Sequence, residues 1–202
     1  MKLKEILILS GVLFILPAMA QETIKQPGDL PYYQIPDYPE EYTANSVAAR
    51  MVDGLGFRYY WATEGLRPED LAFKPNQEAR TTEATLNHIL GLTRILLNSV
   101  KKLPSGALKI DPELSFAEKR QQTLINIKTA SDILKASKPS TLKEYKIIFN
   151  GTEPATEYPF WNLINGPIAD AIWHVGQVVS FRRSSGNPFN SKASVLRGKL
   201  TN

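Results

Sequence analysis

The stretch DAIWHVGQVVSFRR, from Asp170 to Arg183, decides how the rest of the sequence is interpreted. Drawn as an α-helix, in which each residue turns the chain by about 100°, it has apolar side chains in most directions. Asp170, His174 and Gln177 interrupt this pattern as one polar stripe. A helix that is apolar on most sides is usually buried, and a buried carboxylate needs a partner. The stretch therefore predicts a buried helix over about residues 167–184, with polar groups facing inward.

The chain has one other histidine, His88, within the stretch TLNHILGLTRILLNSVK. This stretch predicts a helix from about Thr82 to Lys101 with a wide apolar face. His88 falls near the edge of that face, on the flank shared with Leu92 and Ile95. Both histidines are therefore expected to point between helices.

Three interpretations of the polar stripe remain open from spacing alone. In the first, Asp170 and His174 form an i, i+4 ion pair, and His88 is a separate core residue bonded to backbone. In the second, Asp170 and His174 are a general acid and base that work without metal. In the third, His88, Asp170 and His174 bind one metal ion that keeps an open position for water. Two imidazoles and a carboxylate are a catalytic ligand set for zinc and for non-haem iron.

Two further helices are predicted, over about residues 43–66 and 115–136, and the second begins with a capping box at Ser115 and Glu118. Asn150-Gly151 lies between two short runs and favours a type I′ turn, which predicts a short β-hairpin before the last helix. Four amphipathic helices with modest connections predict an all-α fold, a four-helix bundle.

The N-terminal sequence MKLKEILILSGVLFILPAMA has the charged start, apolar middle and small-x-small ending of a secretory signal peptide. Residues 1–20 are therefore expected to be removed after Ala20, and the protein to be exported, either periplasmic or secreted. A Pro/Tyr-rich arm is expected over residues 21–42, the helical domain over 43–190 and a tail over 191–202.

Composition limits the function further. Removing Lys2, Lys4 and Glu5 from 24 basic and 20 acidic side chains leaves 22 and 19, a net charge of +3. That is too mild a charge to indicate nucleic-acid binding. The chain has no cysteine, which fits export and excludes thiolate ligands. No stable membrane insertion is expected once the signal peptide is removed.

Three stretches together resemble the DinB-like family of four-helix bundles: RYYWATEGLRPEDLAFKPN, EATLNHILGL and NGPIADAIWHVGQVVSFRRSSGNP. The most specific features are a histidine in the second helix and the pattern H-x-G-Q-x-x-x-x-R-R-x-x-G at the end of the fourth. The resemblance covers about residues 43–190. It implies a divalent metal site, most often of zinc or nickel, and pairing into homodimers.

By this resemblance His88 takes the first ligand position and His174 the last. Asp170 stands where the family has a histidine, and a carboxylate there makes the donor set harder. Gln177, Trp173 and Trp61 are the residues expected to lie around the metal or to contact a substrate.

Two classes of function follow. The first is a metal-dependent hydrolase of unknown substrate, in which the metal lowers the pKa of a bound water. The second is a non-catalytic module that binds metal or a small ligand. Metal-dependent thiol transfer, which the family also includes, ranks lower because an exported protein does not meet cytosolic thiols in quantity.

Overall fold

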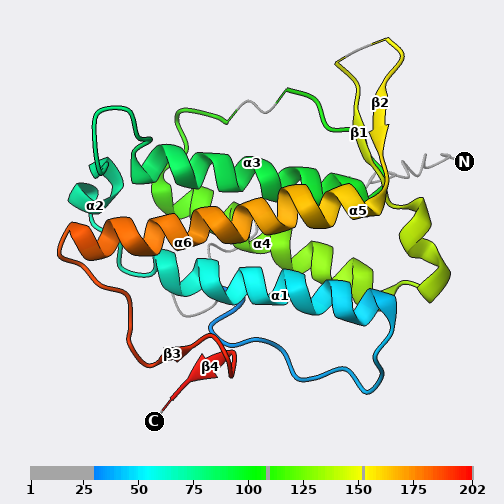
Figure 1. Cartoon of the computed structure of the whole chain (residues 1–202), viewed down its shortest axis with the longest axis horizontal. Coiled ribbons are helices and arrows are strands. Elements are labelled where there is room, and N and C mark those ends of the chain that lie inside the picture. Colours follow the sequence, from blue (N-terminus) through cyan, green and yellow to red (C-terminus); the bar gives the residue numbers. More distant parts are fainter. Residues whose placement is uncertain (1–29, 108–109, 152, 202) are drawn as a thin grey trace, which may run out of the picture.

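The computed structural model describes residues 30–107, 110–151 and 153–201, and within these ranges it is mostly helical (Figure 1). The α-helices are α1 (Ala44–Thr63), α2 (Pro68–Ala72), α3 (Thr82–Val100), α4 (Phe116–Ala136), α5 (Phe160–Leu163) and α6 (Ala169–Ser184). The predicted signal peptide lies outside the described residues. Over the described part of the chain, no helix combines the length and the hydropathy needed to cross a membrane.

The four long helices lie roughly along one direction, and each packs against two others (Figure 1). Helix α1 contacts α4 and α6, and α3 contacts the same two helices. Their shared interior is apolar and closed to solvent; its largest fully buried side chains include Leu55, Phe57, Tyr59, Ile89, Leu90, Leu96, Leu124, Ile127 and Leu134. The all-α prediction is therefore confirmed in its coarse form, a mostly helical protein with two small antiparallel strand pairs.

Three of the four long helices begin where the sequence predicts. Thr43 caps α1 and Thr81 caps α3, each accepting a hydrogen bond from a backbone N–H of the first turn. Ser115 and Glu118 form the predicted capping box of α4, with the Ser115 N–H donating to the Glu118 carboxylate over 2.8 Å. Helix α1 ends at Thr63, three residues before the predicted end at residue 66.

The last helix differs from the prediction at its start. Pro167 was expected in its first turn, but α5 runs directly into a π-helical segment, η3 (Ile164–Ile168), and then into α6, as one continuous rod (Figure 1). Pro167 therefore lies inside the helix. Proline lacks an N–H and clashes with the preceding turn, and a wider π turn accommodates it. Asn165 and Gly166, which lie just before the predicted start of the helix at residue 167, are part of this wide turn.

The region between α4 and α5 contains the predicted hairpin but not the predicted turn. A 3₁₀ helix, η2 (Pro139–Glu144), leads into β1 (Ile147–Phe149), which pairs with β2 (Thr156–Tyr158). Because Phe149 pairs with Thr156, residues 150–155 form the connection, and Asn150-Gly151 is only its beginning. The expected two-residue type I′ turn is therefore wrong.

The N-terminal arm lies along α1. The Tyr32 hydroxyl donates to buried Asp53 over 2.9 Å, and the Arg50 guanidinium donates to the Pro36 carbonyl. Gly56 is required beneath Tyr32, because an added Cβ would lie 2.4 Å from its ring. Burial and the Asp53 carboxylate raise the pKa of Tyr32, so its hydroxyl stays a donor. In the tail, β3 (Ala193–Ser194) pairs with β4 (Lys199–Leu200). The arm contacts this tail through the Ile35 N–H, which donates to the Gly198 carbonyl.

A buried polar network joins the C-terminal ends of α1 and α6. Arg182 is almost fully buried, and its Nη1 donates to the carbonyls of Trp61, Ala62 and Glu64, which end α1. These carbonyls have no partner inside their own helix, so a cationic donor stabilises them. The first arginine of the R-R-x-x-G pattern thus holds two helices together.

Candidate metal centre

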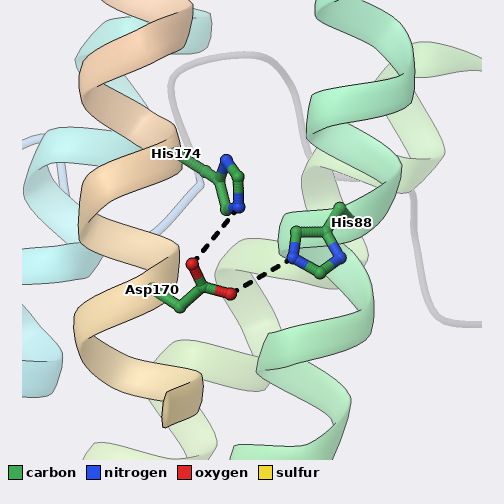
Figure 2. Close-up of side chains that lie close together, drawn as sticks. All are labelled: His88, Asp170 and His174. Atoms are coloured by element: carbon green, nitrogen blue, oxygen red, sulfur yellow. Dashed lines mark hydrogen bonds and ion pairs between the residues drawn. The ribbon is translucent and has the colours of Figure 1, made fainter. Parts of the chain in front are cut away.

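Figure 2 shows His88, Asp170 and His174 facing one another between α3 and α6. His88 Nε2 lies 3.2 Å from Asp170 Oδ2, and His174 Nε2 lies 3.3 Å from Asp170 Oδ1. One ligand atom from each of the three residues lies within 4.8 Å of the other two. Over the residues that the structure describes, this is the one group of three or more such side chains that can hold a metal ion.

The positions of the three side chains follow from two separate features of the fold. Asp170 and His174 share one face of α6 because they are i, i+4 neighbours. His88 is 82 residues from Asp170 in sequence and reaches it only because α3 packs beside α6. The three predicted ligands therefore come together, as the sequence indicated.

The spacing of the donors fits a small divalent ion. A tetrahedral ion with bonds of about 2.0 Å to nitrogen and oxygen separates its ligand atoms by about 3.3 Å. The two contacts of Asp170, at 3.2 and 3.3 Å, match that separation. They are longer than a charge-assisted N–H···O⁻ bond, which is about 2.7–2.9 Å. The two contacts run to different oxygens of Asp170, and the three donors lie close enough together to hold one divalent ion.

Gln177 determines which nitrogen of His174 faces the carboxylate. Its Oε1 lies 2.8 Å from His174 Nδ1, so Nδ1–H donates to the amide oxygen and Nε2 keeps a lone pair when the ring is neutral. Asp170 Oδ1 presents a second lone pair to Nε2. A proton on Nε2 or a metal cation between the two atoms makes this contact favourable. Gln177 thus prepares His174 to bind a cation through Nε2, in the way that ligand-orienting groups commonly do.

The site is half-buried, whereas the sequence predicted a buried stripe. The side chains of His88 and Asp170 are 36% and 37% exposed, and that of His174 is 15% exposed. Helix α6 has a solvent face, since Trp173 is 71% exposed and its neighbours Gly176 and Ser180 are exposed as well. The prediction of a buried helix is wrong because apolar composition does not bury a face that no other element covers. The exposure leaves the cluster open to small molecules.

Of the two tryptophans expected near the site, Trp173 is exposed to solvent and Trp61 lies elsewhere. Trp61 is buried against Phe57 and Tyr60 of its own helix, and its indole N–H donates to the Tyr33 carbonyl. With Ile172 and other side chains it lines a hollow of about 400 Å³ between α1 and α6, away from the face of α6 that carries His174. The structure therefore brings together four of the six predicted site residues: the three candidate ligands and Gln177.

Comparison with known proteins adds no assignment: no protein-family model matches the chain, and no curated protein matches it. The fold and the site define a helical protein with a candidate metal centre between two of its long helices. The geometry of that centre carries the functional argument.

Proposed function

We propose that the protein is a DinB-like four-helix bundle, made of α1, α3, α4 and α6, that binds a divalent metal through His88, Asp170 and His174. The pairwise packing of the four long helices supports the bundle. The resemblance of three sequence stretches supports the family. The observation that carries the metal proposal is the pair of 3.2 and 3.3 Å contacts from one carboxylate to two imidazole nitrogens.

Zinc or nickel fits this donor set. Imidazole nitrogen suits both ions, and zinc accepts a mixed set of two histidines and a carboxylate in catalytic sites. The carboxylate cancels one positive charge of the ion and helps to keep it in a site that water reaches. Because metal binding requires unprotonated imidazole nitrogens, uptake is expected to release protons.

The proposed activity is that of a metal-dependent hydrolase of unknown substrate. A bound divalent ion would supply an activated water and polarise a substrate oxygen. The chain's own contribution is to hold the three donors on two packed helices, to fix the His174 ring through Gln177 and to leave one side open to solvent. These are the features expected of a catalytic site, since a structural site is usually closed by four protein ligands.

A non-catalytic metal-binding module is the alternative, because among the residues that the structure describes the cluster contains only these three donors. The coordination shell of the bound metal distinguishes the hydrolase from the binding module. An exchangeable water on the bound ion, measured by water-proton relaxation of the manganese- or nickel-loaded protein, supports the hydrolase. A complete shell of protein donors supports the binding module. Metal-dependent thiol transfer ranks third, because an exported protein does not meet cytosolic thiols in quantity.

Export and pairing are part of the same proposal. The mature chain is expected to begin at Gln21 in an envelope fraction or in the medium, and intact mass tests this. A homodimer is expected at micromolar concentration, and light scattering that gives a monomer mass contradicts it. No role in nucleic-acid binding is proposed.

The test of the metal proposal is His88→Ala, with Lys101→Ala as an exposed control at the end of the same helix. Protein refolded with zinc and freed of excess ion is expected to carry about one equivalent by elemental analysis in the wild type and in the control. His88→Ala is expected to lose most of it. If His88 were a separate core residue, its removal would leave the metal content unchanged.

Asp170→His provides the complementary test. It gives the cluster the three histidines that the family resemblance implies, and the variant is expected to keep the metal. Wild-type protein that takes up neither zinc nor nickel on refolding overturns the metal site and the hydrolase together.

A further inference from the structure

A second candidate site lies at the N-terminal end of α1 and shares no residue with the metal cluster. It is a hollow of about 550 Å³. Its walls come from four parts of the chain: residues 42–43, the first two turns of α1, Leu142 and Lys143 of η2, and residues 159–164 around α5. All four parts lie at the same end of the molecule (Figure 1). A second, smaller hollow that includes Tyr38 adjoins it across Tyr42, Val47 and Met51.

Large apolar side chains stand exposed around this hollow. Tyr42 is 97% exposed and Trp161 is 74% exposed, and Val47 and Met51 of α1 are exposed beside them. Single exposed apolar residues are ordinary on protein surfaces, whereas several that gather in one concave place indicate an interaction site. Aromatic and aliphatic side chains in one lining suit an alkyl chain, since removing both surfaces from water stabilises the complex.

The charge of the lining favours one sign of ligand. Lys143 is the single charged side chain among the lining residues, and none of them is acidic. Lys143 is exposed and, over the described residues, has no ion-pair partner. Glu144, which follows Lys143 directly, forms its ion pair with Lys102 over 2.5 Å and does not line the hollow. Glu40 and Glu41, which precede Tyr42, do not line it either. The hollow thus combines a mostly apolar lining with one cation, Lys143.

We propose that this hollow binds an amphipathic anion, such as a long-chain carboxylate. Its alkyl chain would lie across Val47, Met51 and Trp161, and its head group would lie at Lys143. The volume falls within the range of about 300–1,000 Å³ that is usual for small-ligand sites. A second copy of the chain would need a flat or protruding complement, and a concave wall built from four segments favours a small ligand.

Sodium dodecanoate, below its micelle concentration, is the probe for this proposal. Isothermal titration of the full mature chain is expected to give saturable binding with one carboxylate per chain. Trp161→Ala is expected to weaken it at least about tenfold, since aromatic anchors carry much of the affinity in such sites. Trp173→Ala removes an equally exposed tryptophan outside the hollow and is the matched control.

The head group is tested by its charge. Lys143→Gln is expected to weaken dodecanoate binding by about threefold, the size of an exposed charge pair, and to leave dodecyltrimethylammonium binding unchanged or stronger. Lys138→Gln changes an exposed lysine outside the hollow and is expected to change neither. Val47→Asp places a carboxylate at an exposed position of the wall, where folding tolerates it, and is expected to abolish dodecanoate binding.

Three outcomes overturn the proposal. The first is the absence of saturable binding to the wild type. The second is an equal loss of affinity in Trp161→Ala and Trp173→Ala, with both variants folded by circular dichroism. The third is a dimer that Val47→Asp dissociates while dodecanoate fails to bind, which would assign the hollow to a second copy of the chain.

Discussion

Two aspartates, Asp70 in α2 and Asp170 in α6, show opposite uses of a carboxylate in one small protein. Asp70 is completely buried and accepts five hydrogen bonds, from three groups of Arg67 and from the side chains of Ser185 and Asn187. Asp170 is 37% exposed and faces only two imidazole nitrogens. The first carboxylate has a donor for nearly every lone pair, and the second has not.

The difference teaches how to separate a structural carboxylate from a candidate ligand. Hydrogen bonds from Arg67, and then from Ser185 and Asn187, hold the pKa of Asp70 well below its usual range. That network is complete and excludes further partners. The groups around Asp170 are imidazoles, which are candidate metal ligands, and solvent reaches them. A carboxylate with a donor for nearly every lone pair stabilises the fold, while a half-exposed one that faces two imidazole nitrogens is a candidate metal ligand.

The largest expected effect comes from Asp70→Ala. It removes the carboxylate that Arg67, Ser185 and Asn187 share as an acceptor, and with it the negative charge that most raises the pKa of buried Arg182. Breaking a buried charged network costs about 3–5 kcal/mol, so urea unfolding should show a loss of that size. The zinc content of the folded fraction should not change. A loss below about 1 kcal/mol would mean that this network does not stabilise the fold.

Asp170→Ala should behave in the opposite way. In the presence of a chelator its unfolding free energy should lie within about 1 kcal/mol of the wild type, because partly exposed pairs contribute little. With zinc at a hundredfold excess over its dissociation constant, the wild type should gain about 2.7 kcal/mol and the variant nothing. Asp132→Ala, which removes an exposed i, i+4 pair with Lys128, is the matched control and should keep the zinc response. An equal zinc response in Asp170→Ala would remove the carboxylate from the ligand set.

Gln177→Leu sharpens the comparison at the edge of the site. It removes the acceptor of the His174 Nδ1–H and frees the ring to turn, so zinc affinity should fall by about tenfold. Stability in chelator should hardly change, since Gln177 is partly exposed. Gln177→Glu keeps an acceptor in place and should restore the affinity. A competition titration against a zinc indicator measures all three proteins.

The smallest expected effect is on acid stability. Because the pKa of Asp70 is lower in the folded than in the unfolded protein, its contribution is complete above the usual carboxyl pKa and is lost as the pH falls below it. Between pH 6 and pH 3.5 only the start of this loss is sampled. The wild type should lose about 2 °C more of its Tm than Asp70→Asn, measured calorimetrically in chelator. A steeper loss in the variant would contradict the assignment.

Local features of the sequence predicted the helices well. The predicted starts of α1, α3 and α4 are right to within one residue, because the bonds by which Thr43, Thr81 and Ser115 cap them are made within the first turn. The continuous rod from α5 to α6 was missed, since Pro167 and the Asn165-Gly166 pair resemble a boundary unless the helix widens into a π turn. The type I′ turn was missed because strand register, and not the Asn-Gly pair, determined the loop.

What the sequence by itself determined is short in range: the long helices and the placing of Asp170, His174 and Gln177 on one face of α6, since helical geometry fixes neighbours at i+3 and i+4. The packing of α3 on α6 decided that His88 meets them, 82 residues away. Packing also decided that Trp173 is exposed and that Trp61 lies away from the site. It decided as well that the Arg182 side chain bonds to the carbonyls at the C-terminal end of α1. Burial and long-range contact depend on which elements cover one another, and a pattern read along a single helix does not contain that information.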